Sequence, residues 1–357
     1  MSPTEPRQPS GLSRRTFLRA AGVSAVVLPI AAGCSRTAAT SGSTTSQPAT
    51  TAPVGSSAGS SRTAQNLGSI TLPAPSLGLL GNAPLHIAVA QGYFKDAGVD
   101  VQLADVIGTD VIRAIQTTSP IGVAGCLPMA VAFSKGVKDL RIVAPMYGAA
   151  QNDFIAPANG TVKTLADLKA GMKIGGSIPA TPPTYFAAAV IKKAGLTPSQ
   201  VQIINLGRAP DSWTAAQKGL VDLTWSNPPF DTTLIQSGKA VRVISAAALV
   251  PKWLDTALAT TQKNIDEKGD VVAAVIVAVG RARQLILTDP ATAAKAWAHN
   301  AKLDPAVTTA ALKAAPAAAW APVIDPAAVQ ACIDAGHDVG SITGAVDLSL
   351  FVSNKFA

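Results

Sequence analysis

Apolar residues come in short blocks along most of the chain after about residue 68. Runs of about four to eight apolar residues bounded by Gly, Pro or Asn predict strands, and longer blocks with apolar i, i+3 and i+4 positions predict helices. The predicted strands are 69–72, 99–106, 121–124, 140–144, 154–156, 173–175, 201–206, 221–225 and 241–244. The predicted helices between them are 83–91, 108–118, 127–135, 165–169, 183–194, 209–218 and 229–236. This alternation is typical of parallel βαβ units, whose sheet is covered by helices on both faces.

The chain beyond Pro251 has a different pattern, rich in Ala and with Pro at the start of most blocks. Proline suits the first turn of a helix because no backbone N–H is needed there. We therefore expect only helices in this part of the chain, at 271–287, 290–300, 305–313 and 326–337.

The predicted helix at 83–91 has residues typical of helix ends and one apolar face. Asn82 can cap it with its side-chain oxygen, and Pro84 lies in its first turn. Leu85, Ala88 and Val89 share a face, so we expect this face to pack on a sheet while the amino end points toward a ligand.

The amino terminus carries the pattern of an export signal. Residues 13–19 read Ser-Arg-Arg-Thr-Phe-Leu-Arg, which matches the twin-arginine pattern with Arg14 and Arg15 as the pair. The apolar run 20–32 that follows is too short to cross a bilayer, so it is interpreted as the hydrophobic part of a signal peptide spanning residues 1–33.

The sequence Ala-Ala-Gly-Cys that ends at Cys34 is similar to the lipobox that directs acylation of a cysteine. The alternative is a stray cysteine at the end of an ordinary signal. Residues 34–67 are mostly Ser, Thr, Ala and Gly without apolar periodicity, which predicts a tether. Its root-mean-square reach is about 30 Å.

Length and charge limit the classes of function. At 357 residues the chain exceeds one usual core, which favours two lobes. The net charge of +8 falls to +5 without residues 1–33. The basic residues are scattered and not interleaved with aromatic residues, which argues against nucleic acid and leaves room for a cleft that binds anions.

Cysteine and histidine residues give no sign of a metal or cofactor. Cys126 and Cys332 could form one disulfide, but we favour two unpaired, buried thiols. The three histidines, His86, His299 and His337, lie in distant segments. We therefore predict no metal site, no cofactor and no catalytic residue.

Three stretches carry a resemblance to a known family. They are Leu-x-Ile-Ala-x-x-x-Gly-Tyr-Phe-x-x-x-Gly-Val-Asp-Val at 85–101, Ile-Gly-Val-Ala-Gly at 121–125 leading into Lys-Gly-Val-Lys at 135–138, and Gly-Leu-Val-Asp at 219–222 leading into Pro-Pro-Phe at 228–230. Together they resemble the nitrate, sulfonate and taurine type of substrate-binding proteins of ABC importers, the SsuA-like and NMT1/THI5-like family.

The resemblance implies an α/β fold of the type II periplasmic-binding class, with a ligand cleft between two α/β lobes. The chain would cross between the lobes near 147–152 and 245–251. We place the first lobe at 68–149 with 249–357, and the second lobe at 150–248.

In such lobes the amino ends of helices face the cleft, and their free N–H groups can hold an anion. Ordinary capping is the alternative for each of these helix starts. The residues expected at the ligand on this ground are Asn82, Ala83, Pro84, Gly108, Thr109, Gly125, Cys126, Leu127, Thr181, Pro182, Asn227 and Pro228.

Four polar or aromatic residues of the second lobe are expected nearest the ligand: Thr181, Tyr185, Arg208 and Trp225. Arg208 could instead form an ion pair with Asp211, and Trp225 could belong to the core of the lobe. Cys126 could have a reactive thiol, although a small packing residue is favoured.

These features predict a lipid-anchored, monomeric substrate-binding protein on the outer face of the plasma membrane, with an ABC permease and its ATPase as partners. Asn227 stands where relatives often have Glu, which favours a sulfonate or carboxylate over an amino-bearing solute such as taurine; nitrate and neutral pyrimidines also suit relatives. The alternatives are an enzyme of the same fold, such as a pyrimidine-precursor synthase, and a solute sensor without transport.

Overall fold

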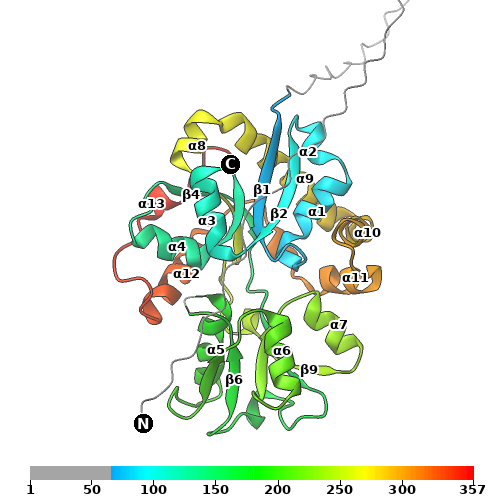
Figure 1. Ribbon diagram of the computed structural model, residues 1–357, viewed down its shortest axis with the longest axis vertical. Helices are drawn as coiled ribbons and strands as arrows, with labels where there is room; N and C mark the ends of the chain where they lie inside the picture. Colours follow the sequence, from blue (N-terminus) through cyan, green and yellow to red (C-terminus); the bar gives the residue numbers. More distant parts are fainter. Residues whose placement is uncertain (1–65, 180) are drawn as a thin grey trace, which may run out of the picture. The chain divides into compact units, whose positions relative to one another are not determined.

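The computed structural model describes residues 66–179 and 181–357 (Figure 1). The predicted twin-arginine pair, the predicted lipidation site Cys34 and almost all of the predicted tether lie outside the described residues.

The strands form three sheets, with the orders β1-β2, β3-β10-β4 and β7-β6-β8-β5-β9. The first nine strands overlap the nine predicted ones. In chain order the strands are β1 Ser69–Pro75, β2 Asp100–Val106, β3 Gly122–Gly125, β4 Leu140–Tyr147, β5 Asp153–Pro157, β6 Lys173–Gly176, β7 Gln202–Asn205, β8 Leu223–Ser226, β9 Ala240–Ser245 and β10 Thr256–Thr261.

Helices surround these sheets. They are α1 Ala83–Ala90, α2 Tyr93–Asp96, α3 Gly108–Thr117, α4 Cys126–Ser134, α5 Pro182–Lys193, α6 Ala209–Gln217, α7 Phe230–Gln236, α8 Gln262–Glu267, α9 Gly269–Thr288, α10 Pro290–Ala301, α11 Pro305–Ala314, α12 Pro326–Asp338 and α13 Leu348–Phe351. Four short 3-10 helices are η1 Leu80–Asn82, η2 Leu165–Asp167, η3 Ala246–Ala248 and η4 Ala317–Trp320. The helix predicted at 165–169 is thus only the single turn η2.

We call the part built on β1–β4 and β10 the first lobe, and the part built on β5–β9 the second lobe. The chain passes between them in 148–152 and again in 246–255. Figure 1 shows the second lobe in green, and α8 to α13 beside the first-lobe strands.

Parallel pairing holds for only part of each lobe. β1–β2, β6–β7 and β6–β8 are parallel, whereas β10 is antiparallel to β3 and β4, and β5 is antiparallel to β8 and β9. The strands β5 and β10 each follow a passage from the other lobe and not a crossover helix, so nothing obliges them to run parallel to their neighbours.

The strand β10 contradicts the prediction that only helices follow Pro251. Its sequence, Thr-Ala-Leu-Ala-Thr-Thr, is fully buried and pairs on both edges, with β3 and with β4. Small Ala and Thr side chains fit the middle of this three-stranded sheet. Tertiary pairing therefore overrides the weak local preference of an Ala-rich segment.

Proline explains why the first lobe has two separate sheets. Ser119 donates its hydroxyl to the Thr71 carbonyl at 2.7 Å, so this edge of β1 faces the chain at β3. Every second residue of a strand presents its backbone groups to the same neighbour, so Pro73 and Pro75 face the β3 side as Thr71 does. Neither proline has an N–H, so neither can donate a hydrogen bond to β3. A side chain at Gly122 of β3 would meet the Pro73 carbonyl oxygen at 2.9 Å, so the strands are close without a hydrogen-bonded ladder.

The helix α1 differs from the prediction in two ways. It is not one-faced, because all residues from Ala83 to Ala88 are buried, with α9 and α10 packed against the helix. The Asn82 side chain does not cap it either. Its Nδ2 donates instead to the Pro75 and Ser76 carbonyls, at 2.8 and 3.2 Å.

The helix α9 is long and apolar enough to cross a membrane by length and composition alone. Its residues Val272, Val275 and Val279 are fully buried, and the helix packs on α1, α2 and α10. This is the pattern of a core helix.

Candidate functional site

A cavity of about 460 Å³ lies where both lobes and the C-terminal helices meet. The first lobe contributes the loop after β1 and the end of β2. The second lobe contributes the start of α6, the end of β8 and the start of α7. The third side comes from the residues around the start of α11. We call it the cleft pocket. It is lined by Ser76, Gly78, Leu79, Asp105, Arg208, Ala209, Pro210, Trp225, Asn227, Pro229, Phe230, Thr233, Leu303, Asp304 and Val307.

Arg208 supplies the positive charge of this pocket. It is the residue immediately before α6, at the carboxyl end of the parallel pair β6–β7. The predicted alternative, an ion pair with Asp211, does not form, and none of the ion pairs among the described residues includes Arg208. Its guanidinium donors are therefore available to a solute.

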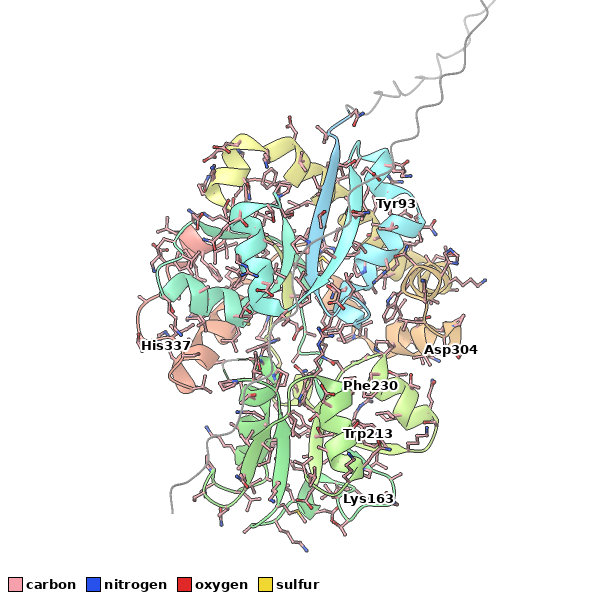
Figure 2. The ribbon with its side chains drawn as sticks, viewed as in Figure 1. Tyr93, Lys163, Trp213, Phe230, Asp304 and His337 are labelled. Atoms are coloured by element: carbon pink, nitrogen blue, oxygen red, sulfur yellow. The ribbon has the colours of Figure 1, made fainter. Side chains whose placement is uncertain are left out.

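Two carboxylates also line the pocket, which the prediction from Asn227 did not consider. Asp105 accepts the Ser76 N–H at 2.8 Å, and Asp304 accepts the Ala306 N–H at 2.7 Å at the start of α11. Both carboxylates thus stabilise backbone turns of the protein. Figure 2 labels Asp304 beside the C-terminal helices and Phe230 at the start of α7.

Trp225 belongs to the core and to the pocket at once. Only 7% of its surface is exposed, and it joins the same buried cluster as the first-lobe helix α4. Its indole Nε1–H is buried without a hydrogen-bond acceptor. A buried donor without a partner is costly, and none of the described residues accepts this N–H.

The loop Asn227–Pro228 links the lobes directly. The Pro228 carbonyl accepts the Leu80 N–H at 3.0 Å. Asn227 is buried and lines the cleft pocket, whereas Pro228 lines a second cavity of about 230 Å³ on the other side of this contact.

The other helix starts do not reach the cleft pocket. Asn82, Ala83 and Pro84 are buried, and the Asn82 side chain turns back to β1 while its Oδ1 stays buried without a donor. Gly108 is half-buried and Thr109 exposed, and neither lines the cleft pocket.

At the start of α4, a backbone carbonyl of the protein, and not a ligand, accepts the free helix N–H. The Cys126 N–H donates to the Asp255 carbonyl at 3.2 Å, and Cys126 and Leu127 are fully buried. The thiol of Cys332 lies nearby and donates to the Leu254 carbonyl at 3.3 Å. Cys126 and Cys332 are both free and buried, as predicted, and Gly125 is half-buried.

Thr181, Pro182 and Tyr185 form a separate group at α5. The Thr181 hydroxyl donates to the Ile178 carbonyl at 2.6 Å. Tyr185 stacks on Trp253, with ring centroids 5.8 Å apart and planes 6° apart. Burial and the nearby acidic residues of α12 raise the pKa of Tyr185. The structure therefore brings Arg208, Trp225 and Asn227 together and leaves the α5 group among aromatic side chains.

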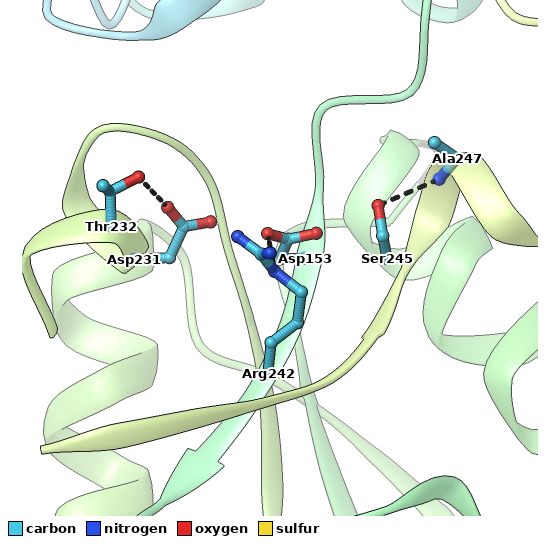
Figure 3. A network of polar contacts seen from close by, with 6 residues as sticks. All are labelled: Asp153, Asp231, Thr232, Arg242, Ser245 and Ala247. Carbon is cyan, nitrogen blue, oxygen red and sulfur yellow. Dashed lines mark hydrogen bonds and ion pairs between the residues drawn. The ribbon is translucent and has the colours of Figure 1, made fainter. Parts of the chain in front are cut away.

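A polar network crosses the second lobe, and its residues Asp153 and Arg242 line the second cavity (Figure 3). Arg242 donates to Asp153 at 2.5 Å, and Asp231 faces this pair from the first turn of α7. Asp231 has no exposed surface, and its Oδ2 has no hydrogen-bond partner. Burial first, and then the negative charge of Asp153, raise the pKa of Asp231 to about 8.

The two passages between the lobes are tied to each other. Gln151 accepts the Gly81 N–H at 3.1 Å and donates to Asp255 at 2.5 Å. Complete burial raises the pKa of Asp255 to about 6. One side chain thus joins both passages to the first turn before α1.

The apolar walls of the cleft pocket were not predicted as site residues. Leu79, Phe230, Leu303 and Val307 come from segments that local patterns assign only to loops and helix starts. No group of three or more His, Cys, Asp or Glu residues in 66–179 and 181–357 could hold a metal ion.

The family model described as NMT1/THI5 like matches residues 81–293. No curated protein sequence matches the chain. The solved alkanesulfonate-binding protein SsuA from Xanthomonas axonopodis pv. citri, bound to MOPS, is 20% identical, with a TM-score of 0.65 over 82% of this chain and 99% of its own. The periplasmic aliphatic sulphonate-binding protein SsuA from Escherichia coli is 17% identical, with a TM-score of 0.65 over 80% and 92%.

The desulfurization enzyme DSZB is also similar, at 14% identity and a TM-score of 0.61 over 80% of this chain and 97% of its own. At such identities the likeness shows the fold alone. It confirms the predicted α/β architecture with two lobes, the type II periplasmic-binding fold.

Proposed function

Because the chain belongs to the NMT1/THI5-like family, we propose that it is the extracytoplasmic substrate-binding protein of an ABC importer. It captures a small anionic solute of the sulfonate, nitrate or carboxylate kind in the cleft pocket and delivers it to the permease. No bond is made or broken. In this proposal the lobes are 68–149 with 249–357, and 150–248.

The observation that carries this proposal is the unpaired Arg208 in a pocket that both lobes build. A guanidinium without a protein partner is suited to an anion because its planar donors match the oxygens of a sulfonate, nitrate or carboxylate.

An enzyme of the same fold is the second candidate, since DSZB shares the architecture. The residues that line the cleft pocket include neither histidine nor cysteine, and Cys126 and Cys332 are fully buried. The described walls therefore offer hydrogen bonds and apolar contact but none of the usual nucleophile–base pairs, which favours capture over catalysis. A sensor without transport would use the same pocket, and uptake of the solute by cells with and without the protein separates the two.

The proposed location is the outer face of the plasma membrane. Export would use the twin-arginine signal with Arg14 and Arg15, and acylation of Cys34 would anchor the monomeric protein through its tether. Several acyl chains hold a protein on a bilayer where one alone is marginal.

The proposal is tested by calorimetry with ethanesulfonate, nitrate and acetate on the wild type, on Arg208→Gln and on Arg113→Gln. Arg113 is an exposed arginine of α3 that pairs with Asp110 and is not part of the cleft pocket. A hydrogen bond to a charged group contributes about 1.5–3 kcal/mol, so Arg208→Gln should weaken the best anion roughly ten- to hundredfold, with Arg113→Gln unchanged. Equal affinities in the two variants would refute the role of this pocket.

A further inference from the structure

The walls of the cleft pocket are largely apolar, which indicates what kind of group the solute carries besides its anionic head. Eight lining residues offer only apolar contact or, in one case, an aromatic ring with a single N–H. They are Leu79, Ala209, Pro210, Trp225, Pro229, Phe230, Leu303 and Val307. They come from both lobes and from the chain before and within α11, so they surround the cavity and do not form one side of it.

The size of the pocket points the same way. Its volume of about 460 Å³ equals the share of roughly 15 water molecules in the liquid, at about 30 Å³ each. A nitrate or a methanesulfonate would replace only a few of these waters and would leave most of the apolar walls wet. A solute with a ring would cover them, and the apolar area removed from water would strengthen binding.

The charges limit the number of anionic groups. Arg208 is the only cationic residue among those that line the pocket. Asp105 and Asp304 lie on the sides built by the first lobe and the C-terminal helices, and their backbone partners hold them in place. A second anionic group on the solute would find no free cation there and would meet these carboxylates.

We propose that the solute is a monoanion with an apolar body of the size of an aromatic ring, its head on Arg208 and its body against Phe230, Leu303 and Val307. This rests on the proposed capture function and names the class of solute within it. The head is a sulfonate or a carboxylate, because both present at least two oxygens that the forked guanidinium donors of Arg208 can bind together.

The test is calorimetry on the full-length wild-type protein with solutes that share a head. The sulfonate arm compares benzenesulfonate with methanesulfonate, and the carboxylate arm compares benzoate with acetate. In whichever arm binds, the ring should raise the affinity at least tenfold over the methyl group, because it buries more apolar surface. Benzene-1,3-disulfonate should bind at least tenfold more weakly than benzenesulfonate.

A variant localises the effect. Phe230→Leu keeps an apolar side chain but removes the ring, so it should weaken the ring-bearing solute severalfold and leave the methyl-bearing one unchanged. Phe356→Leu, near the carboxyl end and outside the pocket, is the matched control, and circular dichroism checks that both variants are folded.

The outcomes separate the two proposals. If methanesulfonate or acetate binds as tightly as its ring-bearing partner, and Arg208→Gln weakens both, then the proposed capture of an anion holds. The proposal that the solute has an apolar body is then wrong. Tight binding of the disulfonate would also overturn the monoanion. If no anion of either arm binds but nitrate does, this inference fails and the capture of an anion stands. If nitrate does not bind either, the proposed function fails as well.

Discussion

Asp231 is expected to hold a proton at neutral pH, and its replacement by asparagine tests this. Its carboxyl group is fully buried. One oxygen accepts a hydrogen bond from Thr232 at 3.1 Å, and the other accepts none from the described residues and lies toward Asp153. Asp153 faces Asp231, and Arg242 pairs with Asp153 (Figure 3). The Arg242 side chain is 43% exposed, so a single, partly solvated cation must compensate the charges of two carboxylates.

Competing effects can be ranked by size. The first turn of α7 favours a negative charge by about 0.3–1 kcal/mol, or up to ~2 when partly buried. The pKa of Asp231 rises from 3.8 to about 8, which at about 1.4 kcal/mol per unit corresponds to roughly 5–6 kcal/mol against the charged form. Burial and the charge of Asp153 therefore outweigh the helix end.

The sign of the pH dependence follows from this rise. A folded-state pKa above the unfolded one means that the folded protein holds the proton more tightly. The stabilisation is complete below the unfolded pKa of about 3.8 and is lost as the pH rises through the folded pKa of about 8. Between these values the free energy of unfolding should fall by about 1.4 kcal/mol per pH unit from this group.

Asp255 adds a similar slope only up to its own folded pKa of about 6, so measurements from pH 6.5 to 7.5 isolate Asp231. Asp231→Asn cannot ionise, and its amide can donate toward Asp153 in place of the carboxyl proton. Across this window the wild type should lose about 1.2 kcal/mol more than Asp231→Asn, because the folded carboxyl begins to ionise near the upper end.

The assay is urea unfolding followed by circular dichroism at several pH values, with the difference between the two slopes as the measured quantity. Asp211→Asn is the control, because Asp211 lies in the first turn of α6 as Asp231 does in α7 but is exposed. It should keep the wild-type slope. Equal slopes in the wild type and Asp231→Asn would show that Asp231 is already ionised in the folded protein.

Three further predictions concern the passages between the lobes and the anchor. Gly81→Ala should cost about 1–3 kcal/mol in thermal or urea unfolding, because a Cβ there would meet the Gln151 amide nitrogen at 3.0 Å, whereas Gly78→Ala, which meets nothing within 4 Å, should not. Saturation with a solute that binds should reduce the radius of gyration in small-angle scattering, since the lobes close by bending at both passages, and an unchanged radius would reject closure. Cys34→Ser should release the protein into the medium, and its retention on cells would count against lipidation.

Local sequence patterns predicted most elements of this chain well. Each strand from β1 to β9 lies where a short apolar run is bounded by Gly, Pro or Asn, and proline opens α5, α10, α11 and α12. These features depend on backbone conformations and on neighbours within one or two turns, so they are readable without the rest of the molecule. Arg208 and Trp225, which line the cleft pocket, were also predicted in this way, because a residue at the end of a strand lies at the cleft edge of a sheet. Their contact with a ligand stays a prediction.

The pairing of distant segments was decided only by the tertiary structure. The sequence of β10 is too rich in Ala to predict a strand, and it becomes one because β3 and β4 offer both of its edges a partner. The Asn82 side chain bonds to β1 and not to its own helix, and the start of α4 faces the Asp255 carbonyl and not a solute.

The cleft pocket shows the same division. The place of Arg208 after a strand end follows from the local pattern. The apolar walls, however, bring together Leu79, Phe230 and Val307, which span more than two hundred residues of chain, and no local spacing predicts this contact. Contacts of this kind form because burying apolar surface is favourable wherever the fold brings it together, whatever the distance along the chain.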